Sequence, residues 1–310
     1  MTAPNASVES PASPRRRPWK WLLALPVALV GGVWWFTEPL TDHPTAPPAT
    51  PTEAIAVPPV VAKLAEGPVA WPEGRLEGDG AKKILLASMV RSVEALEKVE
   101  GYTATLRKTE RMAGRLGPEQ TLVMKVRNRP FAIYLKFLSP KAGKEVVYAE
   151  GHHDNKLIAH NGDWTRRIVP RLAVPVDSPL ALADSRHPVT EAGLVALARK
   201  LLSYRELDIG DGEATTVMDR TVTAEGRALL RSVHTHTNPN ARRPFARVEV
   251  LYDPATQYPI QITSYDWPAT GHDGDLDLAE KFAYDDLKLN APLTPADFDP
   301  ANPDYAFMRF

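Results

Sequence analysis

Histidines are the residues whose type and spacing come closest to metal chemistry in this sequence. His152, His153 and Asp154 are consecutive in a stretch rich in turn formers, and His234 and His236 lie two positions apart. Residues two apart on a strand share a face, which is a spacing that zinc ligands use. Because no third ligand follows at a matching interval, we expect solvated turn and strand histidines and no metal site.

The sequence carries no recognisable catalytic motif. It lacks a G-x-S-x-G nucleophile elbow, a glycine-rich phosphate loop and an H-E-x-x-H helix. It also has no cysteine, which excludes a thiol nucleophile, a thiolate metal site and a disulfide. We therefore predict a non-catalytic protein that uses no cofactor, and a hydrolase with an unrecognised site stays open as a third hypothesis.

The charge balance argues against nucleic acid as a partner. The chain of 310 residues carries a net charge of −1, so its surface has no overall basic field for phosphates. Many of its 30 prolines precede residue 75, which shortens the part of the chain that can fold. We expect one folded domain.

Along residues 121–160, apolar and polar side chains alternate with a period of two. We expect the strands that they form to position any binding surface. Phe131, Ile133 and Leu135 alternate with polar residues such as Lys136, which predicts strands that are wet on one face. Turn formers at short intervals make this stretch an antiparallel meander. Apolar positions here and in later strands are expected to face a ligand cavity, although core packing explains them equally: Phe131, Ile133, Leu135, Val248, Val250, Ile260 and Ile262.

Charged residues that alternate into the sheet need partners. Glu110 and Arg111 are adjacent and therefore point to opposite faces of one strand, so one of them points inward. A buried charge is costly unless it is paired. We predict that an inward Arg111 or Arg127 pairs with an inward Glu145.

Two helices are predicted to cover the sheet. Residues 81–100 place apolar side chains three and four apart and end at Gly101, which we assign as the C-cap. Residues 190–202 carry a leucine stripe, which fits either a helix that plugs the core or a lid over a cavity. The proline-rich residues 169–187 before it are too long for a hairpin loop, and such lengths are typical of lids or disordered segments.

The last third of the chain returns to the strand period. Strands are predicted at residues 216–223, 228–237, 245–252, 258–265 and 276–289. Two helices cannot cover both faces of so long a sheet. We predict an α+β domain of mainly antiparallel strands, a curled, half-open β-barrel with the helices packed in or over its concave face.

The N-terminal segment has the pattern of a membrane anchor. Basic residues from Arg15 to Lys20 precede an uncharged apolar run at residues 21–36, and four of the seven tryptophans lie at the two ends of this run. Indole prefers membrane interfaces and basic residues prefer the cytoplasmic side, so residues 19–36 are expected to contact the bilayer. The run is short, and a cleaved signal peptide with a secreted product stays open, although the bulky residues 34–36 do not suit a cleavage site.

These features divide the chain into four parts. We predict a cytoplasmic tail at residues 1–14, a single transmembrane signal anchor at 15–36, a proline-rich disordered linker at 37–80 and a folded domain at 81–310. The folded domain is then extracytoplasmic and tethered near the membrane.

Six segments carry a likeness to a known family: GYTATLRKTER, KVRNRPFAIYLKFLSP, GKEVVYAEG, RHPVTEAGL, VLYDPATQYPIQITSYDWP and FAYDDLKLNAPLTPADFD. Together they resemble a bacterial family of cell-envelope proteins, domain-of-unknown-function family 1571, over residues 82–305. More distantly, the Arg-Pro-Phe strand, the glycine turn and the closing Tyr-Asp-Pro hairpin are similar to the LolA and LolB lipoprotein carriers.

The resemblance implies a half-open barrel whose concave face holds acyl chains, and it implies no catalytic residue. In LolA-like proteins an arginine beside a proline contacts the lid; Arg129 matches it by register, and Arg127 lies two residues earlier on the same strand face. An anchored protein without cysteine cannot shuttle freely or carry a lipid on a cysteine as those carriers do. Lipid handling is therefore expected at the bacterial inner membrane, on its periplasmic side.

We therefore predict a membrane-tethered domain that binds a lipid, a lipoprotein acyl chain or another apolar ligand in the concavity of the sheet. The alternative is an interaction or sensor module for another envelope protein, in the manner of the sigma-factor regulators that share this fold. Fold alone does not decide between them, because one fold hosts many functions.

Overall fold

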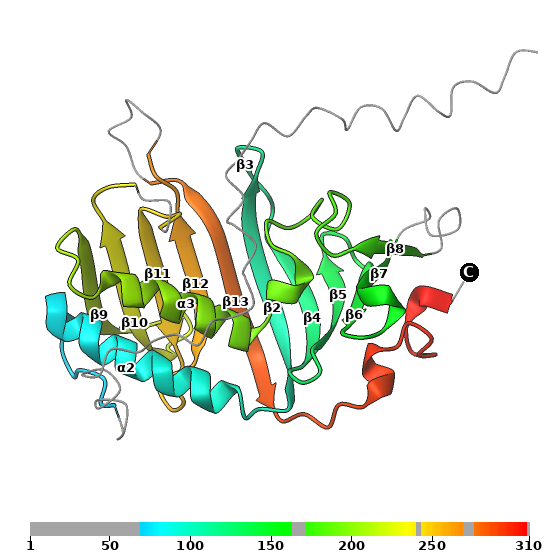
Figure 1. Ribbon diagram of the computed structural model, residues 1–310, viewed down its shortest axis with the longest axis horizontal. Coiled ribbons are helices and arrows are strands. Elements are labelled where there is room, and N and C mark those ends of the chain that lie inside the picture. The colour runs from blue at the N-terminus through cyan, green and yellow to red at the C-terminus, as the bar shows by residue number, and fades with distance from the viewer. Residues whose placement is uncertain (1–68, 163–170, 240–242, 269–275, 309–310) are drawn as a thin grey trace, which may run out of the picture. The chain divides into compact units, whose positions relative to one another are not determined.

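Residues 101–112, whose side chains alternate between buried and partly exposed, form a strand near the middle of a large sheet (Figure 1). The computed structural model describes residues 69–162, 171–239, 243–268 and 276–308. Within these ranges 13 strands form one sheet, and every pairing is antiparallel.

In sheet order, the strands are β1 (Leu76–Glu77), β9 (Ala214–Val222), β10 (Ala228–His236), β11 (Arg247–Tyr252), β12 (Pro259–Tyr265), β13 (Leu278–Leu289), β2 (Gly101–Met112), β4 (Gln120–Arg127), β5 (Ala132–Ser139), β6 (Glu145–Ala149), β7 (Lys156–His160) and β8 (Leu172–Pro175). The short strand β3 (Arg115–Leu116) pairs with the end of β2. Two meanders therefore meet where β13 pairs with β2, and the sheet path runs from β1 to β8 without closing among the described residues.

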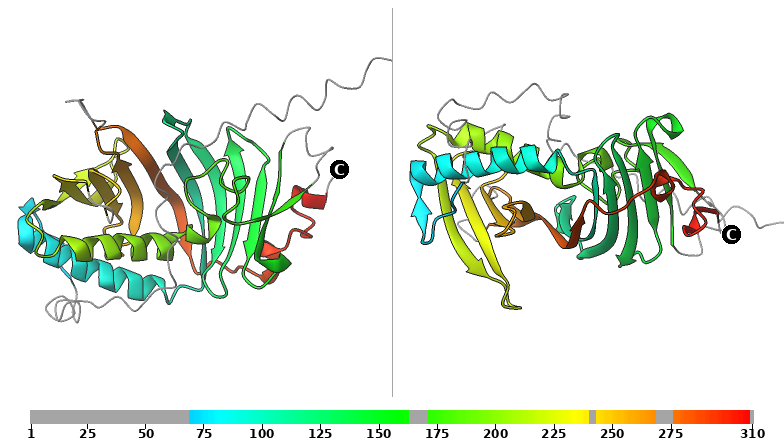
Figure 2. Two further views of the ribbon diagram at one scale, coloured as in Figure 1. Left: turned by 45° about the horizontal axis from the view of Figure 1, so that its top comes forward. Right: turned by 90° about the horizontal axis from the view of Figure 1, so that it is seen from below.

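The sheet curls around two helices that lie on its concave face, α2 (Gly78–Leu96) and α3 (Leu194–Asp208) (Figure 2). Apolar side chains of both helices form one core with the concave face of the strands. This arrangement confirms the predicted curled, half-open, mainly antiparallel sheet with helices against its concave side.

Helix α2 begins and ends earlier than the periodicity predicted. Its buried residues include Leu85, Leu86 and Met89, as an amphipathic helix on a sheet requires. The predicted C-cap, Gly101, is instead the first residue of β2. A Cβ atom there would lie 2.7 Å from the backbone oxygen of Val126, so close strand packing explains this glycine.

Helix α3 begins at Leu194 rather than at the predicted residue 190. The Leu194 backbone N–H donates to the Tyr102 hydroxyl at 2.7 Å, which satisfies one of the free donors of the first turn. Gly193 precedes it with a φ of 101°, and a Cβ atom there would lie 2.7 Å from that hydroxyl. The predicted start is occupied by a short 3₁₀ helix, η4 (Val189–Glu191).

The convex face of β5 to β7 is not exposed to solvent, although the sequence pattern predicted that one face of these strands would be. The C-terminal segment with η5 (Pro295–Phe298) and η6 (Ala306–Met308) packs on this face and buries it. Tyr134 of β5 stacks on Tyr305 with ring centroids 4.0 Å apart. Another short 3₁₀ helix, η2 (His153–Asn155), connects β6 to β7.

The folded domain begins before residue 81, where the predicted linker was expected to end. The Trp71 side chain is 5% exposed, and its Nε1 donates to the Asp219 backbone oxygen at 3.0 Å. Strand β1 also belongs to the sheet. Of the helices that the structure describes, none has the length and apolarity to cross a bilayer, and the predicted anchor at residues 15–36 lies outside the described residues.

Candidate functional site

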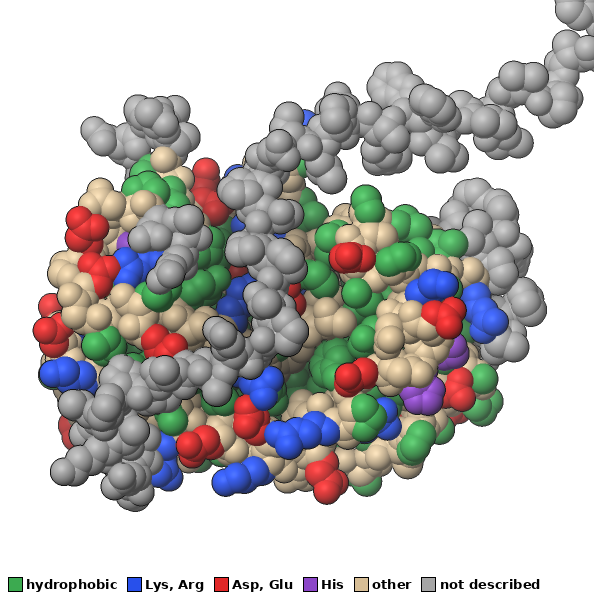
Figure 3. Space-filling view, in the orientation of Figure 1, with side chains coloured by type: hydrophobic (Ala, Val, Ile, Leu, Met, Phe, Trp, Pro, Cys, Tyr) green, Lys and Arg blue, Asp and Glu red, His purple; other side chains and the backbone are tan. Residues whose placement is uncertain are grey.

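An apolar cavity of about 530 Å³ lies between the concave face of the sheet, helix α3 and residues 176–192, which we call the strap. The strap follows β8 and leads into α3. Figure 3 shows hydrophobic side chains in a hollow of the face that carries the helices. The volume falls within the range of roughly 300–1,000 Å³ that is usual for small-molecule sites.

Each strand contributes to the cavity through alternate residues. On β2 the alternation places Leu106 in the wall, and on β5 it places Leu135 and Phe137 there. Helix α3 contributes Leu197 and Leu201 to the wall that faces the sheet. The remaining apolar wall comes mainly from Leu122, Met124, Val146, Leu157, Leu172, Val174, Val248, Ile262 and Phe282.

The structure separates the predicted cavity residues into two groups. Leu135, Val248 and Ile262 line the cavity. The other four do not line it: Ile133 and Val250 are fully buried in the core, Ile260 is buried, and Phe131 lies in the turn before β5 and packs on Tyr148. On β5 and β11, residues two positions apart therefore differ: Ile133 and Val250 pack in the core, whereas Leu135 and Val248 line the cavity.

Two tyrosines contribute to the cavity wall as neutral groups. Burial raises the pKa of Tyr204 to about 12, and nearby Glu280 and Glu191 add to the effect. Burial also raises the pKa of Tyr284 to about 12. Both phenols are therefore uncharged at neutral pH, which keeps this part of the wall compatible with an apolar ligand.

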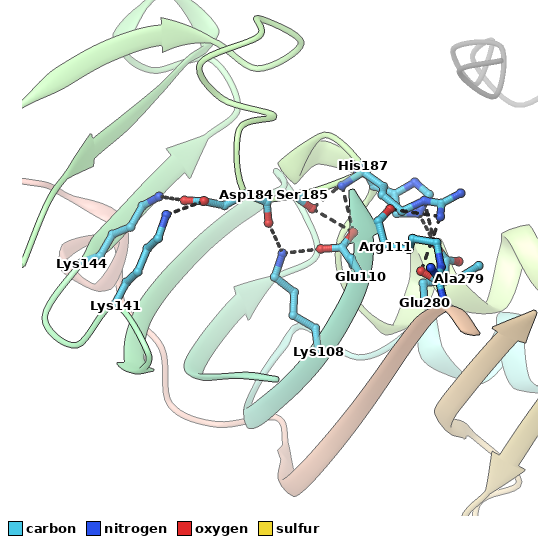
Figure 4. Close-up of polar contacts among 11 residues, drawn as sticks. Lys108, Glu110, Arg111, Lys141, Lys144, Asp184, Ser185, His187, Ala279 and Glu280 are labelled. Carbon is cyan, nitrogen blue, oxygen red and sulfur yellow. Dashed lines mark hydrogen bonds and ion pairs between the residues drawn. The ribbon is translucent and has the colours of Figure 1, made fainter. Parts of the chain in front are cut away.

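The strap is fastened to the sheet by ionic contacts around Asp184 (Figure 4). The Asp184 carboxylate lies 2.5 Å from the Nζ atoms of Lys141 and Lys144, in the connection between β5 and β6. Lys108 of β2 donates to the Asp184 backbone oxygen at 2.9 Å and to Glu110 at 2.6 Å. Burial raises the pKa of Asp184, but the two lysine hydrogen bonds outweigh it and hold that pKa below its ordinary value.

A second set of contacts, made by Arg186 and His187, also fastens the strap to the sheet. The Arg186 backbone N–H donates to Glu110 at 2.9 Å, and His187 Nε2 lies 2.8 Å from the Glu280 carboxylate. Burial raises the pKa of Glu280, but the His187 hydrogen bond and the charges of Arg186 and Lys200 lower it below its ordinary value. Residues 184–187 thus close one side of the cavity.

The pairing predicted for Glu145 is wrong. Glu145 points to the convex face, where it accepts hydrogen bonds from the Tyr134 hydroxyl at 3.1 Å and the Ala306 backbone at 2.8 Å. Its carboxylate also lies 3.0 Å from His160 Nε2. Burial raises the pKa of Glu145, but these hydrogen bonds lower it overall, so the carboxylate is ionised beneath the C-terminal segment.

The three candidate arginines take other partners and do not contact the strap through their guanidinium groups. Arg111 donates to the Leu278 backbone oxygen at 2.9 Å and pairs with exposed Asp277. The Arg127 Nε donates to the Pro130 backbone oxygen at 3.0 Å. Arg129 donates to a backbone oxygen at the end of α2 at 2.9 Å. The inward charge of the pair at residues 110 and 111 is Glu110, not Arg111.

The histidines divide into an exposed turn and a buried network. His152 and His153 are exposed, as expected, whereas His234 and His236 are buried, so the prediction of solvated strand histidines is wrong for them. His236 Nε2 lies 3.1 Å from Asp208, beside Arg205 and Arg243. No group of three or more potential ligands among the described residues is placed to hold a metal ion.

Ser232, His234 and Asp208 come closest to a catalytic triad in the part of the chain that is described. Ser232 Oγ lies 2.9 Å from His234 Nε2, but His234 Nδ1 lies 4.0 Å from Asp208 and 3.1 Å from the Thr216 hydroxyl. Ser232 Oγ is shared with the Tyr252 hydroxyl at 3.0 Å and is 0% exposed. A substrate has no access to this serine, and the group acts as a buried polar network.

Apart from Glu110, the charged residues that fasten the strap were not identified from the sequence. A signal for Lys108 was present, because Lys108 and Glu110 continue the alternation that places Tyr102 and Leu106 on the buried face of β2. Charged side chains at the buried positions of a strand require partners. Asp184 gave no such signal, because it lies in a loop and its partners are distant in sequence.

No curated protein matches this chain. Three similar solved structures are the lipoprotein LppX of Mycobacterium tuberculosis (14% identity, 72% of this chain and 100% of that chain, TM-score 0.38), a putative outer membrane lipoprotein-sorting protein domain of Vibrio parahaemolyticus (10%, 68% and 94%, 0.33) and the LolA superfamily protein NE2245 of Nitrosomonas europaea (9%, 69% and 96%, 0.27). A family model matches residues 99–307, and the chain therefore belongs to the family described as protein of unknown function (DUF1571).

Proposed function

We propose that this domain binds the apolar part of a lipid, a lipoprotein acyl chain or another apolar ligand in the cavity, without catalysis. The observation that carries the proposal is the cavity itself, a space of about 530 Å³ walled by apolar side chains and left unfilled by the two helices. Burial of about ten methylene groups contributes on the order of 8 kcal/mol before the costs of association. That gain is enough for specific binding.

The proposed location follows from the N-terminal sequence. Residues 15–36 would anchor the chain in the bacterial inner membrane, and a proline-rich tether after them would hold the domain on the periplasmic side. An anchored domain takes its ligand from the membrane within reach of its tether. If the anchor is cleaved, the same cavity serves a secreted form.

Lipid extraction followed by mass spectrometry tests the proposal. The full chain is purified from membranes, and its bound lipids are compared with those of the Leu135→Trp and Ile262→Trp variants, which fill the cavity from opposite sides. Val222→Trp is the control, because Val222 is 64% exposed and does not line the cavity. We expect a stoichiometric lipid on the wild type and the control only. Equal lipid content in all four proteins would contradict the proposal.

A second candidate is the binding of another envelope protein at the mouth of the same cavity. Leu172 and Leu180 line the cavity and are 38% and 57% exposed, so they offer apolar contacts to a partner segment. Chemical cross-linking in intact cells tests this function. A stoichiometric protein adduct that is lost in the Leu180→Asp variant would support it, and recovery of lipid alone would exclude it.

A further inference from the structure

The apolar cavity and a smaller pocket meet at one group of charged residues. Lys108, Lys141 and Asp184 line both the large cavity and a second pocket of about 210 Å³. Glu110 and Gln120 also line the smaller pocket. A ligand that extends from one space to the other therefore meets apolar walls along one part and charged side chains at the other.

The charged group has an excess of positive charge. Three ammonium groups, on Lys108, Lys141 and Lys144, face two carboxylates, on Asp184 and Glu110. The side chains of Lys108 and Lys144 are only 9% and 18% exposed. Ammonium groups with limited access to water gain from any further anion that hydrogen-bonds to them.

Asp184 occupies the position that a ligand anion would take. Its carboxylate comes from the strap and bridges two lysines of the sheet at 2.5 Å each. A phosphate or carboxylate presents the same acceptor oxygens. The Gln120 Oε1 atom of the smaller pocket is buried and has no hydrogen-bond partner among the described residues, so a donor group of a ligand has an acceptor there.

We infer that this lysine group binds the anionic headgroup of an amphiphile whose acyl chain lies in the large cavity, and that Asp184 competes with the headgroup for Lys141 and Lys144. The inference rests on the proposed function, because the acyl chain occupies the cavity described above. It adds that the ligand is anionic and that its headgroup lies between the strap and the connection from β5 to β6.

Three matched compounds test the inference on the full chain in a non-ionic detergent. Radiolabelled oleoyl-lysophosphatidic acid is bound in a scintillation proximity assay and is displaced by the unlabelled lipid, by monooleoylglycerol or by glycerol 3-phosphate. Monooleoylglycerol lacks the phosphate, and glycerol 3-phosphate lacks the acyl chain. We expect the phosphorylated lipid to displace the label at a concentration about tenfold lower than monooleoylglycerol, as charge-assisted hydrogen bonds predict.

Substitutions assign the effect to the lysines. Lys141→Gln combined with Lys144→Gln should abolish the preference for the phosphorylated lipid while monooleoylglycerol still binds, which shows that the variant is folded. Asp184→Asn should strengthen binding of the phosphorylated lipid about fivefold, because partly exposed ion pairs contribute about 1 kcal/mol at most. Lys83→Gln is the control, since exposed Lys83 of α2 does not line either space.

The outcomes separate this inference from the proposed function. Equal displacement by the two lipids would overturn the headgroup inference and leave acyl binding intact. Saturable displacement by glycerol 3-phosphate alone would show a site for a free phosphate ester and would also overturn it. Absence of saturable binding by either lipid would contradict the proposed function itself.

Discussion

Glu110 of β2 and Glu280 of β13 lie directly opposite each other in the sheet, and both side chains are buried. Two carboxylates opposite each other destabilise an antiparallel pair unless other groups compensate. Here the compensation comes largely from the strap, through Arg186 and His187, and from Lys108. The strap is therefore needed by the sheet beneath it, and the charges that fasten it are not ordinary surface charges.

Acid should loosen the strap. The folded pKa of Glu280 lies below its ordinary value, so its ionised form stabilises the fold above the unfolded pKa, and this stability is lost as the pH falls toward the folded pKa. The pKa of Asp184 is shifted in the same direction. We expect the free energy of unfolding to fall between about pH 5 and about pH 3, measured by urea denaturation of the full chain.

Two variants sharpen this pH prediction. Glu280→Gln removes one titrating group and should make the loss of stability with acid shallower than in the wild type. Glu94→Gln, at an exposed position of α2, should keep the slope of the wild type. Parallel slopes for all three proteins would show that Glu280 is not stabilised by the strap.

Neighbouring positions on one face of β5 should respond differently to truncation. Ile133 is 0% exposed and packs in the core, whereas Leu135 lines the cavity. Ile133→Ala should lower the free energy of unfolding by about 3 kcal/mol, because it leaves a new void. Leu135→Ala only enlarges an existing space and should cost about 1 kcal/mol. Equal costs in denaturant titrations would mean that the cavity is closed in solution.

The buried network beside α3 should be structural. Asp208 pairs with buried Arg205, His236 and Arg243. Burial raises the pKa of Asp208, but the His236 hydrogen bond and the charges of the two arginines lower it overall. Asp208→Asn should therefore destabilise the fold by about 3–5 kcal/mol, since it leaves buried charges unpaired. At low temperature, we expect the Asp208→Asn variant to retain lipid binding. A variant of normal stability would contradict this account.

Ser232→Ala distinguishes a polar network from a hidden hydrolase. Loss of the Ser232 hydroxyl, which is shared by His234 and Tyr252, should cost about 1–2 kcal/mol in thermal or chemical denaturation. If an ester substrate were hydrolysed by the wild type and not by this variant, the serine would be catalytic and the non-enzymatic assignment would be wrong.

Trp71 marks the start of the folded domain. It packs against Tyr252 with ring centroids 5.1 Å apart and donates a hydrogen bond to the Asp219 backbone oxygen. Trp71→Ala should lower the free energy of unfolding by about 3–5 kcal/mol, as for other buried aromatic residues. Trp267→Ala is a less buried comparison and should cost less. A neutral Trp71→Ala variant would place the boundary nearer to residue 81.

The strands could be predicted from sequence because apolar and polar side chains alternate within each one. The strand predicted at residues 228–237 is β10 at Ala228–His236, and that predicted at 258–265 is β12. The resemblance over residues 82–305 likewise matches the family over residues 99–307. Local patterns of this kind need no knowledge of distant partners.

The contacts of Asp184 could not be predicted, because its partners are far from it in the chain. Asp184 meets Lys141 and Lys144 only after β5, β6 and the strap have folded together. The wet face expected for Tyr134 fails for the same reason, since Tyr305 covers it from the C-terminus. Strand alternation identifies two faces but does not reveal which later segment covers each face.

Photoaffinity labelling in native membranes tests the central claim most directly. Cells that produce the full chain take up a fatty acid with a photoactivatable group along its chain, and labelled peptides are mapped by mass spectrometry. We predict adducts on peptides of β5, β12 and the strap, and their loss in the Leu135→Trp variant. Adducts confined to residues 15–36, with none between residues 69 and 308, would show that the cavity holds no acyl chain and would contradict the account.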